Sequence, residues 1–191
     1  MVIEHLFKTI ESTPVTMQFL RKRLPKDVLV VAYPHLKNKH RSELFKGRRA
    51  VVVLIPKKNT RFGHFVVLLP RKRHIEYFSS LGRSFESELQ SLNEPVAIFR
   101  NLLGENYIYN RTVLQSGKYS INTCAAFVLT RCYLSKLKLP QFAKEVIKEL
   151  RQLGGYPTSF GIEENPVPLR WGELGAKGEV PKKIVPGQKP A

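Results

Sequence analysis

Three consecutive segments decide the fold: RAVVVLIP at residues 49–56, GHFVVLLP at 63–70 and HIEYFSS at 74–80. They are rich in β-branched or aromatic residues, and proline closes the first two, so the sequence predicts strands at 49–55, 64–69 and 74–79. Short links join them, including a basic turn at residues 71–73. We therefore expect the three strands to pair as an antiparallel meander.

Further elements extend outward from this meander. The run at 28–33 fits either a strand or a buried turn. Ser84 is a good N-cap for a helix on which Glu86, Glu88 and Gln90 would face water. The spacing of apolar residues, with Pro and Gly at the ends of segments, predicts helices at 12–24, 85–92, 124–137 and from Pro140 to Gly154. The same signals predict strands at 95–99 and 107–115. The expected fold class is α+β, a central antiparallel sheet with helices packed on it.

The length of 191 residues suits one domain, which we place at residues 1–162. Residues 163–191 are rich in Pro, Gly and Lys and are expected to be a partly disordered tail, most clearly from residue 176. No basic segment followed by an apolar core occurs at the N-terminus, so a signal peptide is not expected. No apolar run approaches about 20 residues, so no membrane span is expected. A monomer is the simplest expectation.

The charge is strongly positive and uneven. Lys and Arg number 32 against 15 Asp and Glu, and residues 1–74 hold 17 of the basic residues with only four acidic ones. Clusters of this kind predict a polyanionic partner, most often nucleic acid bound through its phosphates without sequence preference, although a merely solvated basic surface is the alternative. The candidate contacts are Arg21, Lys22, Arg23, Arg48, Arg49, Lys57, Lys58, Arg71, Lys72 and Arg73.

The two cysteines, Cys124 and Cys132, lie eight residues apart in one expected helix, too far apart for a disulfide. Free thiols suit a reducing, intracellular compartment. Cys124 would begin the helix, where the dipole and unpaired N–H groups favour a thiolate. His64 begins a buried strand. Either residue alone is more often structural, and the cysteines and histidines lack metal-ligand spacing, so no metal or cofactor is expected.

The order of these motifs resembles that of the adenovirus protease (adenain) family and, more distantly, of the proteases of ubiquitin-like proteins. The resemblance covers residues 60–135: Gly63-His64-Phe65 opening a strand, residues 75–82 (IEYFSSLG), Gln115 after a strand, and residues 122–127 (NTCAAF) opening a helix. Those families run His, an acidic residue, Gln and Cys in this order, the reverse of papain. The resemblance implies an adenain-like cysteine protease fold.

Carried onto this chain, the resemblance makes Cys124 the nucleophile and His64 the general base, with the Gln115 amide and the Cys124 N–H holding the oxyanion. Ser79 stands where the family has its acidic residue. A serine can orient the imidazole but cannot stabilise imidazolium as a carboxylate does. The nearest carboxylate along the strand, Glu76, should face the opposite side from Ser79.

Three functions compete at this point. The resemblance implies a viral-type cysteine endopeptidase that cleaves structural precursor proteins in the host nucleus or virion, with DNA as a partner and an activator. The alternative is a weakened or inactive protease fold that serves as a basic nucleic-acid-binding or packaging protein. A hydrolase of ubiquitin-like conjugates is a third reading, which the basic N-terminal part disfavours.

Overall fold

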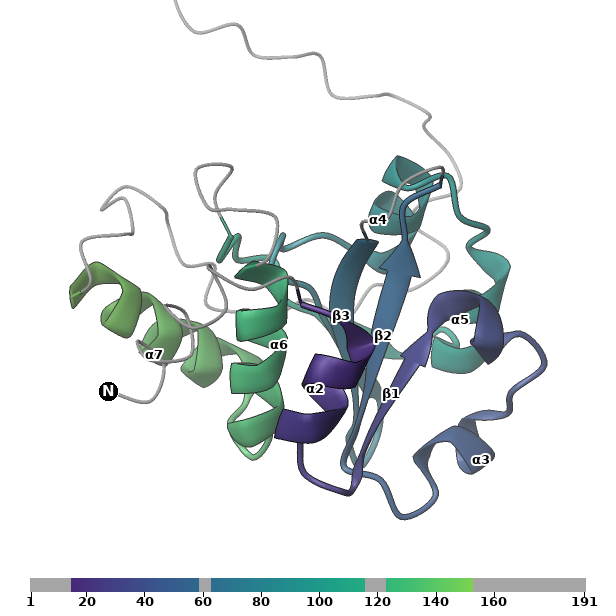
Figure 1. Ribbon diagram of the computed structural model, residues 1–191, viewed down its shortest axis with the longest axis horizontal. Helices are drawn as coiled ribbons and strands as arrows, with labels where there is room; N and C mark the ends of the chain where they lie inside the picture. Colours follow the sequence, from purple (N-terminus) through teal and green to yellow (C-terminus); the bar gives the residue numbers. More distant parts are fainter. Residues whose placement is uncertain (1–14, 59–62, 116–122, 153–191) are drawn as a thin grey trace, which may run out of the picture.

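The sheet is mixed rather than antiparallel (Figure 1). The computed structural model describes residues 15–58, 63–115 and 123–152. Five strands lie in chain order: β1 (Val28–Ala32), β2 (Ala50–Pro56), β3 (Gly63–Pro70), β4 (Ile75–Phe78) and β5 (Tyr107–Tyr109). The β2-β3-β4 meander is antiparallel as predicted, and the run at 28–33 is a strand, but β1 pairs parallel with β2 and β5 parallel with β4.

Both parallel pairs follow from helical connections, since a parallel partner requires the chain to cross back to the same end of the sheet. Between β1 and β2 the chain forms the 3-10 helix η1 (Tyr33–Leu36) and α3 (Arg41–Phe45). Between β4 and β5 it forms α4 (Phe85–Ser91) and α5 (Ala97–Leu103). These four helices belong to the hydrophobic cluster on one face of the sheet.

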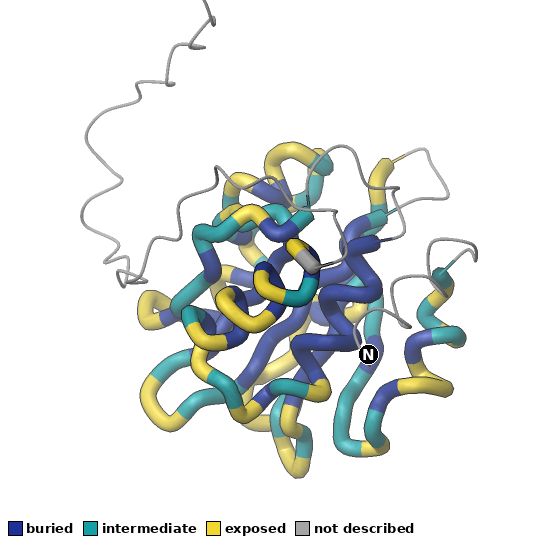
Figure 2. Tube along the Cα trace, turned by 90° about the vertical axis from the view of Figure 1, so that its left-hand side faces the viewer, coloured by how far each residue is buried: buried dark blue, intermediate teal, exposed yellow. Residues whose placement is uncertain are grey.

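The other face carries α2 (Met17–Arg23), α6 (Thr123–Tyr133) and α7 (Leu139–Gln152). Figure 1 shows the sheet between these two groups of helices, and Figure 2 shows its buried centre wrapped by more exposed helices and loops. In β3, Phe65 and Val67 pack toward α6, whereas Val66 and Leu68 pack toward α4 and α5. Because both faces are covered, this strand reads as a continuous apolar run.

Several predicted boundaries are wrong. Residues 95–99 do not form a strand, because α5 places Phe99, Leu102 and Leu103 on one buried face at helical spacing. The strand expected at 107–115 ends at Tyr109, and the helix expected at 124–137 ends at Tyr133. The start of the helix expected at 12–24 and all of the tail at 163–191 lie outside the described residues. No helix in the described ranges is both long and apolar enough to cross a bilayer.

Candidate active site

His64 is the second residue of β3, directly after Gly63. The strand pairs closely there with the end of β2, where His64 is opposite Ile55. A Cβ on residue 63 would lie 2.5 Å from the carbonyl oxygen of Ile55, so only glycine fits. The Gly63-His64 pair therefore brings the imidazole to the end of a buried strand, where helices from both faces of the sheet can reach it.

Cys124 reaches this imidazole from the α6 side. It is the second residue of α6, and its thiol is hydrogen-bonded to the His64 side chain. Backbone groups of Phe65 and Ala125 also hydrogen-bond to the sulfur. Only 3% of Cys124 is exposed. The nucleophile and base predicted from the sequence are thus in contact, each held by a regular element.

Glu88 reaches the same imidazole from the other face of the sheet, and the sequence analysis missed it. Its Oε1 lies 2.9 Å from Nε2 of His64, and its carboxylate is 1% exposed. Tyr77 donates its hydroxyl to Oε2 of Glu88 at 2.6 Å. With Nε2 directed at Glu88, the other ring nitrogen, Nδ1, is the one left for the thiol of Cys124. Glu88, His64 and Cys124 therefore form one continuous relay.

The charges of this relay depend on one another. Burial alone would lower the pKa of His64, but the Glu88 carboxylate outweighs it and raises that pKa to about 10. Burial would raise the pKa of Cys124, yet the hydrogen bond and positive charge of His64 bring it below its usual value. Burial likewise opposes ionisation of Glu88, and His64 again holds the pKa of that carboxyl low. Together these shifts in pKa favour the thiolate of Cys124, the imidazolium of His64 and the carboxylate of Glu88.

The expectation that Glu88 faces water was wrong for an identifiable reason. Glu86, Glu88 and Gln90 recur at every second residue, which is the period of one face of a strand and not of one face of a helix. In α4 the buried residues are Phe85, Glu88 and Leu89, at positions i, i+3 and i+4. A carboxylate inside an apolar helical stripe was the signal that could have identified the residue.

Ser79 supports the relay and does not replace the acid. Its hydroxyl donates to Oε1 of Glu88 at 3.1 Å and lies 3.2 Å from Nε2 of His64. Asn110, also missed from the sequence, holds the backbone of Ser79 on two sides: Oδ1 accepts from the Ser79 N–H, and Nδ2 donates to its carbonyl. Glu76 does face away from Ser79, as strand alternation predicted, and pairs with Arg131.

Gln115 lies near the relay and is connected to the imidazole of His64 through Ser80 and Ser79. Its backbone N–H donates to the carbonyl of Ser80, and its Oε1 accepts the Ser80 hydroxyl at 2.8 Å. Ser80 directly follows Ser79, which touches His64. With Oε1 anchored in this way, the side-chain nitrogen remains as the donor, the group that an oxyanion requires. Residues 116–122, which connect Gln115 to α6, lie outside the described residues.

Cys132 and the tight loop after β4 have structural roles. Burial raises the pKa of Cys132 to about 12, so it is a thiol inside the core.

Gly82 has φ +64°, and a Cβ there would lie 2.8 Å from the carbonyl oxygen of Arg111. This glycine lets the loop that follows Ser79 pack against the segment leading to Gln115. No group that could hold a metal ion occurs among the described residues.

The candidate nucleic-acid contacts fall at two ends of the sheet. Lys57 and Lys58 follow β2 at the end where His64 lies, whereas residues 48–49 and 71–73 lie at the other end. Several of the cations already have protein partners: Arg21 bonds the Val30 carbonyl, Arg23 lies over Phe19, Arg48 bonds the Leu44 carbonyl, Arg49 pairs with Asp27 and Arg71 pairs with Glu76. Lys22, Lys72 and Arg73 are exposed.

No protein-family model matches this chain, and the search of curated proteins finds no significant match.

Proposed function

We propose that this chain is a cysteine peptidase of the adenovirus-protease type. The observation that carries the proposal is the buried relay from Glu88 through His64 to Cys124, in which each charge favours the next. A structural cysteine needs neither a lowered pKa nor a charged partner, as the contrast with Cys132 illustrates. The relay also supplies the acid that the sequence lacks at position 79.

The proposed reaction is the cleavage of a peptide bond. The thiolate of Cys124 attacks the carbonyl carbon, and the resulting oxyanion accepts hydrogen bonds from the Cys124 N–H and the Gln115 amide. His64 then gives its proton to the leaving amine, which releases a thioester on Cys124. Neutral His64 next takes a proton from water as that water attacks the thioester, and the acid product leaves the regenerated thiolate. Glu88 holds the ring and stabilises each imidazolium state.

We infer that the substrates are structural precursor proteins and that the enzyme works beside DNA, in the host nucleus or in a virion. The resemblance to the adenovirus-protease family supports the substrate class. The net charge of +17 and the exposed basic residues support the polyanion. A packaging protein that keeps this fold without the reaction is the second candidate, which the basic clusters alone would favour.

Thiol chemistry and cleavage test the proposal together. Iodoacetamide at about pH 6 should alkylate Cys124 and leave Cys132 unmodified, because only Cys124 has a stabilised thiolate. Purified chain should also cleave candidate precursor proteins, with and without DNA, and His64→Ala should stop both alkylation at this pH and cleavage. Equal alkylation of the two cysteines would contradict the proposed site. Selective alkylation without cleavage of any precursor would favour the packaging protein.

A further inference from the structure

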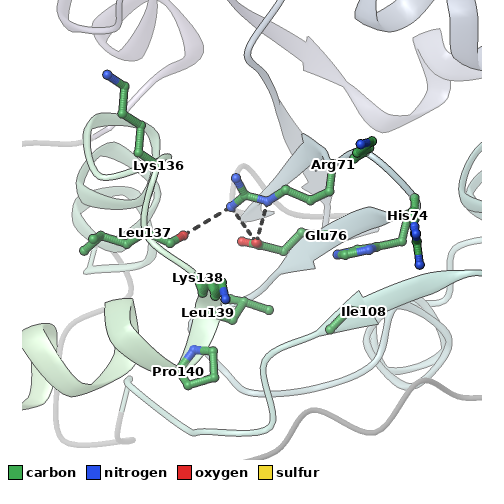
Figure 3. A pocket seen from close by; sticks show the side chains of 11 residues that line it. Arg71, His74, Glu76, Ile108, Lys136, Leu137, Lys138, Leu139 and Pro140 are labelled. Atoms are coloured by element: carbon green, nitrogen blue, oxygen red, sulfur yellow. Dashed lines mark hydrogen bonds and ion pairs between the residues drawn. The ribbon is translucent and has the colours of Figure 1, made fainter.

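A pocket of about 530 Å³ lies at the end of the sheet remote from His64 (Figure 3). It is lined by the β3–β4 turn at residues 71–74, Glu76 of β4, Ile108 of β5, the connection from α6 to α7 at residues 136–138, and the first two residues of α7. We call it the far pocket. Its volume falls within the range of pockets that hold small ligands or a few peptide side chains.

The inner surface of the far pocket is mainly apolar and aliphatic. Ile108, Leu137, Leu139 and Pro140 contribute to it, and Ile108 and Leu137 are only half-buried. Among the residues that the structure describes, no Phe, Tyr or Trp lines it. This surface favours an aliphatic side chain, because burying apolar area is worth about 25 cal/mol per Å². The one ring among these lining residues is the imidazole of His74, at the edge of the β3–β4 turn.

The rim of the far pocket is cationic. Lys72, Arg73, Lys136 and Lys138 are exposed around it, and no carboxylate within the described ranges pairs with any of them. Anionic groups that approach the pocket therefore meet charges that no carboxylate in the described part of the chain neutralises.

The carboxylate inside the far pocket is fully engaged. Glu76 accepts from Arg71 at 2.7 Å and from Arg131 of α6 at 2.7 Å (Figure 3 draws the Arg71 bonds). Both arginines also hold carbonyls that follow α6: Arg71 donates to Ser135 and Arg131 donates to Leu137. Two arginines thus neutralise the Glu76 carboxylate. It holds the walls of the pocket together and does not repel an anionic ligand.

We propose that the far pocket docks an acidic segment of a partner protein, one that places aliphatic side chains on the apolar surface and carboxylates on the lysine and arginine rim. The combination decides against nucleic acid, whose phosphates would use the rim and leave the apolar surface empty. The docked segment does not block the candidate active site, because Cys124 lies near the other end of α6, about 14 Å along the helix from its last residue, Tyr133. The proposal holds whether or not the chain is a peptidase.

Fluorescence anisotropy with labelled peptides tests the proposal on the full chain at about 150 mM salt, where distant surface charges are screened. The probe is Asp-Glu-Leu-Leu-Glu-Asp, and the matched probe has serine at both leucine positions. The leucine peptide should bind at least about fivefold more tightly. Lys72→Gln/Lys138→Gln should weaken it about tenfold. Lys46→Gln/Lys148→Gln, which removes the same charge at exposed sites outside the pocket, should weaken it less than about twofold.

The apolar surface has its own variant. Ile108→Thr should weaken the leucine peptide at least about threefold and leave the serine peptide unchanged, while Ile108→Val, which keeps an apolar side chain, should bind nearly as the original chain does. Equal binding of the two peptides, an equal loss in both lysine pairs, or no binding at all would overturn the proposal. So would an oligonucleotide whose affinity falls with Ile108→Thr, since that result would assign the pocket to nucleic acid.

Discussion

Replacing Glu88 by glutamine removes one charge from the relay and keeps nearly the same shape. Glu88 lies 2.9 Å from His64 and is 1% exposed, so solvent screens this interaction little. A hydrogen bond to a charged group contributes about 1.5–3 kcal/mol. Without it the imidazolium loses its partner, and the thiolate of Cys124 loses the positive charge beside it. Alkylation of Cys124 at about pH 6 should then slow by roughly tenfold to hundredfold, with a loss of similar size in kcat/KM.

The pH dependence gives the sign of the effect. In the original chain the thiolate–imidazolium pair forms above the lowered pKa of Cys124 and is lost as the pH rises through the pKa of His64, at about 10. Loss of the Glu88 charge lowers the pKa of His64 and raises that of Cys124. In a plot of kcat/KM against pH, the acid limb should therefore shift to higher pH and the alkaline limb to lower pH. The pH range in which the enzyme is active should become narrower at both ends.

Mass spectrometry of alkylated peptides measures both cysteines in one sample, so that Cys132 serves as the internal control. The carboxylate can also be moved to another position. The double variant Ser79→Asp/Glu88→Gln again has a carboxylate beside His64, so its Cys124 should be alkylated at least about tenfold faster than that of Glu88→Gln alone. Ser79→Asp alone should not raise the rate, because two carboxylates in contact cannot both ionise freely. A Glu88→Gln chain within threefold of the original rate would refute the assignment of Glu88.

The remaining predictions concern the nucleophile, the serine, the basic surface and the core. Cys124→Ala should abolish cleavage and keep the fold, whereas Cys132→Ala should keep cleavage and lower the free energy of unfolding by about 1 kcal/mol in urea melts. Ser79→Ala should lower kcat/KM less than about tenfold, because a neutral hydrogen bond contributes about 1 kcal/mol; a loss of several hundredfold would show another role. DNA affinity should fall steeply between about 50 and 200 mM salt, and a flat response would exclude phosphate contacts. Arg131→Met should destabilise the fold by about 3 kcal/mol or more in thermal melts, because it leaves a buried carboxylate with one partner fewer; a change below 1 kcal/mol would show that the pair is dispensable.

The centre of the fold was predictable because its signals are local. The β2-β3-β4 meander follows from three apolar runs with short links, and α6 follows from a helix that is apolar almost all round. The parallel edges were not predictable in the same way. The β4–β5 edge depends on α5, whose sequence predicts a strand, and one wrongly assigned connection changes the direction of the strand that follows it. The β1–β2 edge depends on η1 and α3, for which the sequence patterns predict no helix.

The meeting of Cys124 and His64 could be predicted from motif order, but the carboxylate that joins them could not. Motif order directs attention to residue 79, the position after β4 at which the resembled family carries its acid. Glu88 comes nine residues later and from a helix, and only the packing of α4 on the sheet brings it to His64. Sequence distance therefore gave no indication of contact. The helical spacing of Phe85, Glu88 and Leu89 did give one.

Ser79 and Glu88 are best understood as a pair. Tyr77 and Ser79 lie on the face of the sheet that α4 covers, and both donate hydroxyl hydrogens to the Glu88 carboxylate. An acidic residue at position 79 would replace one of those donors with a second negative charge in contact with the first. Once the carboxylate comes from the helix, the strand position needs a small hydroxyl donor, and serine meets that need. The serine at position 79 is therefore consistent with a complete relay whose acid has a different origin, rather than with a site that has lost its chemistry.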